Sequence, residues 1–222
     1  MFIGNSFTFR DGTPDNPAVP NYFKQIAANF NIDTNIDYVL KGSHSLTKFA
    51  DVNDEMGLIV EEKLTSNNYD YIILQEQSTT PLTNYNLFLD AVIKLKKRIL
   101  ETQPSAKTYL YETWGSPKGI EGTEYTTTSE MELALRNAYL EAASESDSSV
   151  TLVGKAFAYA YETLGINVYA EDERHQSGLG AYYSAACHVR AIFKVNVAKC
   201  DYFASFPTQT CLTLLEAVDY II

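Results

Sequence analysis

Short runs of β-type apolar residues alternate along this chain with segments of helical periodicity. The runs lie at residues 2–3, 36–40, 69–74, 108–112 and 150–153. The clearest helix carries an apolar stripe from Phe88 to Ile99, and a long last helix is expected from Gly178 to about Val197. Strands that alternate with helices form parallel sheets covered on both faces. We therefore predict a three-layer α/β/α sandwich around a five-stranded parallel sheet of flavodoxin-like order.

The length and spacing of these segments favour one domain over residues 1–222. A fold of 222 residues buries about 70% of the surface of the unfolded chain. No repeat, low-complexity tract or long linker interrupts the pattern. Residues 115–128 are rich in Gly, Pro and Thr and are expected to form a surface loop. The pattern Ser129-x-x-Glu132 predicts a capping box at the start of the next helix.

The charge balance argues against some classes of partner. The chain has 28 acidic and 17 basic residues, for a net charge of −11. Such a chain repels phosphate backbones, so no nucleic-acid partner is expected. No apolar run approaches the roughly 18 residues of a membrane span. Cys187, Cys200 and Cys211 have no metal-binding spacing and predict buried free thiols.

The chain opens directly on the apolar pair Phe2-Ile3. This pair is shorter than the roughly five residues of an ordinary central strand. We infer that natural residues precede Met1, with room among them for a targeting segment. The compartment therefore stays open between the cytoplasm and, if a signal peptide was removed, an extracytoplasmic location. The oligomeric state stays open as well.

Two short segments carry residues suited to nucleophilic catalysis. Ser6 follows the first strand at a turn that contains Gly4. Asp172 stands three residues before His175, close enough to fold back onto the imidazole. A serine hydroxyl becomes a nucleophile when a neutral imidazole takes its proton, and a carboxylate at the other ring nitrogen fixes the tautomer. We therefore predict a triad of Ser6, His175 and Asp172; a turn serine and a solvated surface histidine are the alternative.

These residues resemble the motif blocks of the SGNH (GDSL-like) serine hydrolases. Gly4-Asn5-Ser6 is similar to the first block, usually Gly-Asp-Ser, and the run Asp172–Ser177 is similar to the last block, Asp-x-x-His-Pro-Ser. Gly42 falls where the second block has its glycine, and Leu74–Ser78 falls where the third block has Gly-x-Asn-Asp. The start Ile-Gly-Asn-Ser-Phe-Thr is similar to that of a bacterial branch of the superfamily. The resemblance implies an α/β esterase that needs neither cofactor nor metal.

The chain departs from the family pattern at three positions. Asn5 replaces an aspartate that is structural in the family, and Gln176 replaces a proline, which we interpret as a change of loop rigidity. Gln77 replaces the asparagine that donates a side-chain N–H to the oxyanion. Glutamine carries the same amide on one more methylene, so Gln77 is the expected donor, with Gln75 as the competing candidate. A buried glutamine that ties loops together is the alternative for this block.

The resemblance then implies an oxyanion hole of three N–H groups. They come from the Ser6 backbone, from the backbone of Gly42 (or Ser43), and from the Gln77 amide. Each such donor typically contributes about 10²–10³ to kcat.

Three further side chains are candidates for contact with a substrate. His44 flanks the second block, Gln75 lies in the third, and Trp114 follows a predicted strand and suits a sugar-stacking platform. A metal site of His44, Asp172 and His175 is the weaker interpretation, because no HxxxH or HxH spacing supports it.

We therefore predict a hydrolase that removes small acyl groups, chiefly acetyl, from carbohydrates through a covalent acyl-Ser6 intermediate. The acidic composition favours neutral sugars over anionic lipids as substrates. A lipid or thioester acyl hydrolase is the alternative within the same class. A catalytically dead hydrolase fold that binds carbohydrate is the alternative from another class, motivated by the unusual third block.

Overall fold

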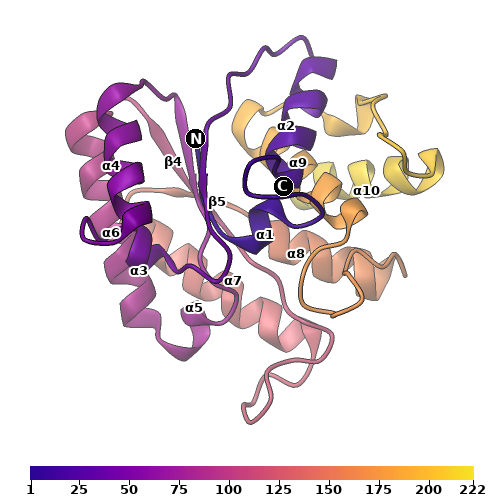
Figure 1. Ribbon diagram of the computed structural model, residues 1–222. Helices are drawn as coiled ribbons and strands as arrows, with labels where there is room; N and C mark the ends of the chain where they lie inside the picture. Colours follow the sequence, from indigo (N-terminus) through magenta and orange to yellow (C-terminus); the bar gives the residue numbers. More distant parts are fainter.

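The computed structural model describes residues 1–222 as a five-stranded sheet with helices on both faces (Figure 1). The strands are β1 (Phe2–Gly4), β2 (Tyr38–Leu40), β3 (Tyr71–Leu74), β4 (Lys107–Tyr111) and β5 (Ser149–Thr151). All neighbouring strands are parallel, and their order is β2-β1-β3-β4-β5. This is the flavodoxin-like order. The predicted three-layer α/β/α fold with five parallel strands is confirmed.

Ten α-helices connect and follow the strands. They are α1 (Ser6–Phe9), α2 (Ala18–Asn29), α3 (Leu46–Phe49), α4 (Glu55–Ser66), α5 (Thr80–Thr83), α6 (Tyr85–Thr102), α7 (Thr128–Glu145), α8 (Val153–Ala158), α9 (Gly178–Phe193) and α10 (Thr208–Ile221). A π-helical turn, Tyr159–Thr163, extends α8, and a 3₁₀ turn, Val197–Lys199, follows α9. Neither α8 nor α10 is among the helices expected from the sequence. None of the helices has the length and apolar character needed to span a membrane.

Helix α7 begins two residues earlier than its predicted capping box requires, with Thr127 and not Ser129 at the N-cap. The box consists of Thr127 and Glu130: Oγ1 of Thr127 accepts from the Glu130 N–H at 3.2 Å, and Glu130 accepts from the Thr127 N–H at 3.1 Å. The predicted Ser129–Glu132 box is wrong, because Glu132 is buried inside the helix and lies 3.4 Å from Arg136. The same spacing occurs twice in this run, and only the first copy coincides with the end of the loop.

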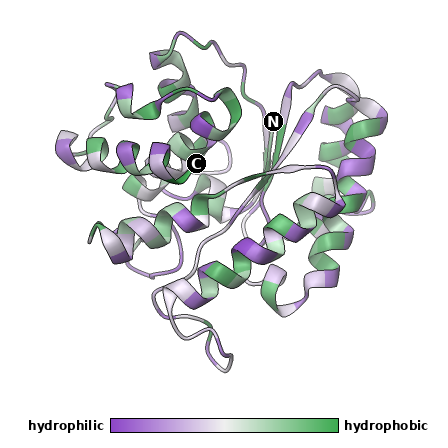
Figure 2. Ribbon diagram, turned by 180° about the vertical axis from the view of Figure 1, so that it is seen from behind, coloured by the Kyte–Doolittle hydropathy of each residue, from purple (hydrophilic) through white to green (hydrophobic).

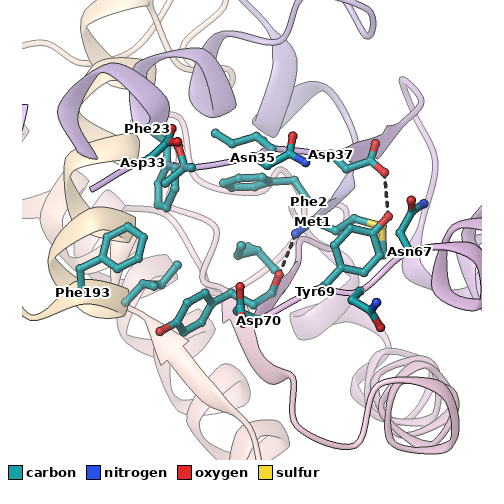
Figure 3. A pocket seen from close by; sticks show the side chains of 16 residues that line it. Met1, Phe2, Phe23, Asp33, Asn35, Asp37, Asn67, Tyr69, Asp70 and Phe193 are labelled. Atoms are coloured by element: carbon teal, nitrogen blue, oxygen red, sulfur yellow. Dashed lines mark hydrogen bonds between the residues drawn. The ribbon is translucent and has the colours of Figure 1, made fainter. Parts of the chain in front are cut away.

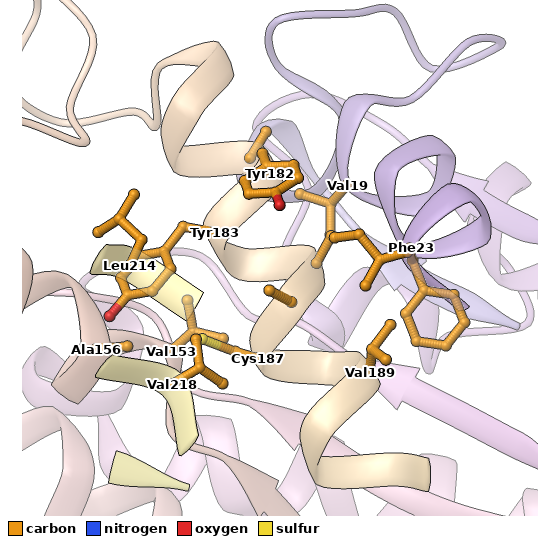
Figure 4. Packing of buried hydrophobic residues seen from close by; sticks show 14 of the residues in the cluster. Val19, Phe23, Val153, Ala156, Tyr182, Tyr183, Cys187, Val189, Leu214 and Val218 are labelled. Carbon is orange, nitrogen blue, oxygen red and sulfur yellow. The ribbon is translucent and has the colours of Figure 1, made fainter. Parts of the chain in front are cut away.

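Successive side chains along each strand point to opposite faces of the sheet and pack into two separate hydrophobic cores. Phe2, Ile73 and Tyr111 pack with α2, α8, α9 and α10, whereas Ile3 and Leu110 pack with α4, α6 and α7. Figure 2 shows the strands as mostly hydrophobic and the helices as divided into hydrophobic and polar stretches. Figure 4 shows how side chains of α2, α8, α9 and α10 meet around α9.

Helix α9 is buried along almost its whole length. Its buried residues include His188, which is fully enclosed between the rings of Phe2 and Tyr111 and contacts the Thr151 hydroxyl at 3.2 Å. A buried histidine of this kind packs the core. The three cysteines are buried and free, which confirms the prediction for them.

The amino and carboxyl ends of the strands carry different features, a hollow at the first and the candidate catalytic residues at the second. At the amino ends, a hollow of about 570 Å³ lies between Phe2, Phe23, Asp37 and Tyr69, with the Met1 ammonium bound to the Tyr71 carbonyl at 2.7 Å (Figure 3). The candidate catalytic residues gather at the opposite, carboxyl ends. Ligands of open parallel sheets bind at that side.

Candidate active site

Ser6 is the first residue of α1, directly beyond the carboxyl end of β1. Asn5 caps this helix by accepting from the Phe7 N–H at 3.2 Å, and its Nδ2 donates to the carbonyl of His44 at 2.9 Å. Glycine is required at position 4, because a Cβ there would lie 2.6 Å from Oε1 of Gln75. The turn therefore closes tightly and places Ser6 at the edge of the sheet. Asn5, expected to be structural, ties this turn to the loop after β2.

Ser6, His175 and Asp172 form one continuous chain of hydrogen bonds. Oγ of Ser6 lies 2.9 Å from Nε2 of His175, although the residues are 169 positions apart in sequence. Nδ1 of His175 lies 2.7 Å from Oδ2 of Asp172, whose Oδ1 accepts from the His175 N–H at 2.9 Å. With its proton on Nδ1, the imidazole donates to Asp172 and leaves the Nε2 lone pair for the Ser6 hydroxyl. The arrangement can thus accept the serine proton.

The environment holds His175 in its neutral form. Burial lowers the pKa of His175 below its ordinary value of 6.5, and the positive charges of Arg10 and Arg174 lower it further, against the opposing effect of Asp172. Burial tends to raise the pKa of Asp172, but hydrogen bonds from His175 and from the Arg174 N–H outweigh it and hold that pKa well below 3.8. At neutral pH the pair is therefore an imidazole beside a carboxylate, the state of a general base.

Arg10 is a member of this cluster that the sequence did not reveal. Its Nη1 lies 3.0 Å from Oδ2 of Asp172 and 2.8 Å from Nδ1 of His175. The guanidinium donates to the carboxylate, since Nδ1 already carries the proton that it donates to the same oxygen. An arginine just after α1 has no recognisable spacing to residues 172–175, so only the fold brings them together. Arg10 restrains the carboxylate on the side away from Ser6.

Gln176 fastens the histidine loop to the helix of the serine. Its Nε2 approaches the carbonyls of Ser6, Phe7 and Arg10 at 3.2, 3.1 and 3.3 Å, and its side chain is buried. The Ser6 carbonyl also accepts from the Arg10 N–H and the Phe7 carbonyl from the Tyr111 hydroxyl, so Gln176 adds a further donor at the end of this short helix. The interpretation of Gln176 as a change of loop rigidity is therefore incomplete. Its amide makes the direct polar link between the two halves of the site.

Two backbone N–H groups beside Ser6 are free to donate. The N–H groups of Ser6 and Gly42 have no acceptor within the protein. Ser43 follows in the left-handed region, with φ of 58°, and turns the chain after Gly42. Both groups were expected to belong to an oxyanion hole, and that role stays a prediction.

Gln75 and Gln77 differ sharply in the use of their amides. Gln75 is fully buried; its Nε2 donates to Oδ1 of Asn5 and to the carbonyl of Glu76, so both of its hydrogens are used. Gln77 accepts through Oε1 from the N–H and hydroxyl groups of Thr79 and Thr80 at 3.0–3.1 Å, while its Nε2 makes one hydrogen bond, to Ser78 Oγ at 3.2 Å. An amide has two hydrogens. One donor of Gln77 therefore remains free, and none of Gln75.

Glu76, between these glutamines, is a buried carboxyl that the sequence did not single out. It accepts from the N–H of Leu46 at 3.1 Å and from the N–H of Gln77 at 2.5 Å. Burial raises the pKa of Glu76 to about 7, against the lowering effect of these two N–H groups. The side chain connects the end of β3 to the first residue of α3 and so positions the loop that follows Gly42.

Burial argues against two of the three expected substrate contacts, Gln75 and His44, and restricts the third, Trp114. Gln75 has no exposed surface, and His44 is 5% exposed with its ring bound to Asp54 at 2.9 Å, so neither is placed to touch a substrate. Trp114 is 2% exposed, stacks on Phe157 at 4.2 Å and donates to the Arg174 carbonyl at 2.9 Å. It supports the histidine loop and lines a neighbouring hollow, but its face is not a sugar platform.

The structure also bears on the alternative of a metal site. The ring of His44 is already hydrogen-bonded to Asp54. No group of three or more His, Cys, Asp or Glu side chains is arranged to hold a metal ion.

Comparisons with known proteins agree with this fold. No family model and no curated protein matches the sequence. Among solved structures, a DUF4886 family protein from Bacteroides uniformis matches with a TM-score of 0.77 at 18% identity, over 99% of this chain and 93% of its own. A protein from Slackia heliotrinireducens, described as a candidate SGNH hydrolase, matches with a TM-score of 0.67 at 20% identity, over 85% and 95%.

An acetyl xylan esterase from Geobacillus stearothermophilus matches with a TM-score of 0.58 at 18% identity, over 92% of this chain and 95% of its own. Identities at this level establish the fold. The resemblance drawn from the motif blocks is thus confirmed in three dimensions, and the chain has the fold of the SGNH hydrolases.

Proposed function

We propose that this protein is a serine ester hydrolase with Ser6 as nucleophile, His175 as general base and acid, and Asp172 as the group that orients the imidazole. The observation that carries the proposal is the hydrogen-bonded chain from Ser6 Oγ through His175 to Asp172. It stands at the carboxyl edge of a sheet with the SGNH fold. A solvated surface histidine, the alternative interpretation, would not be expected to share a hydrogen bond with a serine 169 positions away.

In this mechanism His175 takes the Ser6 proton while Oγ attacks the carbonyl carbon of the ester. The negative charge that develops on the carbonyl oxygen is stabilised by the free N–H groups of Ser6 and Gly42 and by the free amide hydrogen of Gln77. Collapse of the intermediate breaks the bond to the alcohol, which leaves with the proton from His175. Water, deprotonated by His175, then attacks acyl-Ser6 and releases the carboxylic acid and the serine.

Small acyl groups on carbohydrates are the substrates that we propose. An acetyl xylan esterase shares the fold. The loop of residues 115–127 beside the site is rich in polar residues and forms no apolar cap over it. A lipid or thioester hydrolase needs an apolar channel for its longer chain, whereas the hollow lined by Phe7, Trp114, Ile120 and Met131 also carries polar side chains, among them Ser78, Ser116 and Lys118.

Labelling with a fluorophosphonate tests the proposal directly. The reagent phosphonylates a serine only where a base and an oxyanion hole activate it. Mass spectrometry of the wild type should find the adduct on the peptide that contains Ser6, and Ser6→Ala should remain unlabelled. A folded wild type that stays unlabelled would instead support the dead, carbohydrate-binding alternative.

A further inference from the structure

A hollow of about 370 Å³ adjoins the catalytic pair. It lies between the loop after β3, the loop of residues 115–127 and the segment that leads into His175. Asp172, which contacts His175, belongs to its wall, as do Ser78 and Arg174. A substrate whose ester group reaches Ser6 therefore extends into this space.

Arg174 is unusual among the arginines of this chain. The other four each lie within 4.0 Å of a carboxylate oxygen: Arg10, Arg98, Arg136 and Arg190. Arg174 has no such partner, in a chain whose net charge is −11. Its one side-chain hydrogen bond is from Nη2 to the neutral Oγ of Ser78, at 3.3 Å. Arg174 is exposed and lines the hollow, and most of its donors have no partner within the protein.

Ser78 adds a buried donor at the same place. Its side chain is 4% exposed, and its Oγ accepts from both Arg174 and Gln77. A hydroxyl has two acceptor sites and one donor. Because both acceptor sites are occupied, the hydroxyl hydrogen is left to donate, and no atom of the protein accepts it. The guanidinium and this O–H form a recess suited to an anion.

The other charges on the wall do not neutralise this recess. Lys118 is paired with Glu173 at 3.0 Å, and Asp172 is paired with Arg10 and His175. Glu121 lies on the exposed part of the 115–127 loop, beyond salt-bridge distance of Arg174. Arg174 and Glu121 are thus the unpaired charges of this wall, and Arg174 is the one that bonds to Ser78 and directly precedes His175.

We infer that the ester substrate carries a carboxylate, which Arg174 and the Ser78 hydroxyl bind. This inference rests on the proposed esterase function and names its substrate class. The forked guanidinium matches the two oxygens of a carboxylate. Since Arg174 directly precedes His175, the carboxylate belongs within about one sugar ring of the scissile bond. It comes either from the alcohol, as in an acylated uronic acid, or from the acyl group, as in a half-ester of a dicarboxylic acid. This anionic substrate differs from the neutral sugars expected from overall composition.

Two matched pairs of substrates test the inference and separate its two sources. One pair is mono-O-acetyl methyl glucuronoside and mono-O-acetyl methyl glucoside; the other is mono-O-succinyl and mono-O-butanoyl methyl glucoside. The wild type should favour the anionic member of one pair by about tenfold in kcat/KM, mainly through KM, as expected for one charge-assisted hydrogen bond. The pair that shows the preference identifies where the carboxylate lies.

The preference should depend on Arg174 and on salt. In Arg174→Gln, measured at a pH where His175 is neutral, the ratio of the two kcat/KM values should fall to about one. Lys118→Gln removes the same unit of charge from the same wall and should keep the wild-type ratio. In the wild type the ratio should shrink as NaCl is raised, because salt screens exposed charges.

A wild type without preference in either pair, or a preference that survives in Arg174→Gln, overturns the inference. Turnover of p-nitrophenyl acetate and labelling at Ser6 would then still support the esterase. Loss of both of these in the wild type would remove the proposed function itself.

Discussion

Replacing Gln77 by glutamate isolates one hydrogen-bond donor from the structural work of the same side chain. Oε1 of Gln77 holds the first turn of α5 through four contacts at 3.0–3.1 Å to Thr79 and Thr80. A glutamate keeps an acceptor at that position. Its second oxygen takes the place of Nε2. In the wild type the Ser78 hydroxyl accepts from Nε2 at 3.2 Å, and in the variant this hydroxyl donates to the new oxygen instead. The loop is thus retained while the donor is lost.

The expected loss follows from that exchange. Removal of one oxyanion donor costs about 2.7–4 kcal/mol, or about 10²–10³ in kcat. A carboxylate that faces the developing negative charge adds repulsion, so Gln77→Glu should lower kcat by at least about 10³. KM should stay nearly constant, because the interaction is absent from the ground state.

Steady-state kinetics with p-nitrophenyl acetate and thermal unfolding measure the two roles of Gln77 separately. Gln77→Ala should lose both roles, with kcat down by about 10²–10³ and a stability loss of about 1 kcal/mol from the half-buried donors left on Thr79 and Thr80. Thr80→Val removes one hydroxyl contact to Oε1 and no oxyanion donor, so it should cost stability alone. A Gln77→Glu protein with wild-type kcat would refute the third donor.

Four further predictions concern the triad, its pH dependence, its support and its acyl preference. Ser6→Ala and His175→Ala should each abolish nearly all turnover of p-nitrophenyl acetate, and the double variant should be little worse. Asp172→Asn should lower kcat by at most about 10⁴. Wild-type turnover in Ser6→Ala would disprove the mechanism. The rate should fall as the pH is lowered, with a midpoint at the His175 pKa, below 6.5. Arg10→Gln should move this midpoint to higher pH, because loss of a positive charge favours the imidazolium. A midpoint that does not move, or that moves to lower pH, contradicts the assignment. Gln176→Met should cost about 1–3 kcal/mol in thermal unfolding and lower kcat more than it raises KM, and unchanged kcat would mean that the link to α1 does not position the pair. For uncharged acyl groups, kcat/KM should fall by about 1–3 kcal/mol per methylene, so an octanoyl ester that outperforms the acetyl ester would favour a lipid hydrolase.

The fold was predictable because its signals are local. The five β-type runs and the stripe from Phe88 to Ile99 each follow from side-chain periodicity, and the alternation of strands with helices implies the parallel order. The misplaced capping box shows the limit of local reasoning. Thr127–Glu130 and Ser129–Glu132 have the same spacing, and the choice between them depends on where the loop ends and which glutamate is buried.

Only those residues of the site that lie in short sequence motifs could be predicted. The contact between Ser6 and His175 follows from two blocks that both lie at strand ends. Arg10 and the contacts of Gln176 escaped because their partners lie more than 160 residues away in the sequence. Composition could not reveal Arg174, since a net charge of −11 describes the whole chain and says nothing of a single unpaired guanidinium.

The supports of the site are mostly amides, and this has a consequence for how it works. Asn5 and Gln75 bond to each other between the ends of β1 and β3, and Gln176 joins the histidine loop to α1. Apolar packing tolerates small shifts, whereas a buried amide with an unmet partner costs about 1–3 kcal/mol, so these bonds hold the loops in one arrangement. Amides also carry no charge that changes with pH. These amide links, unlike the Glu76 carboxyl that positions the loop after Gly42, therefore keep their charge while the imidazole of His175 gains and loses its proton.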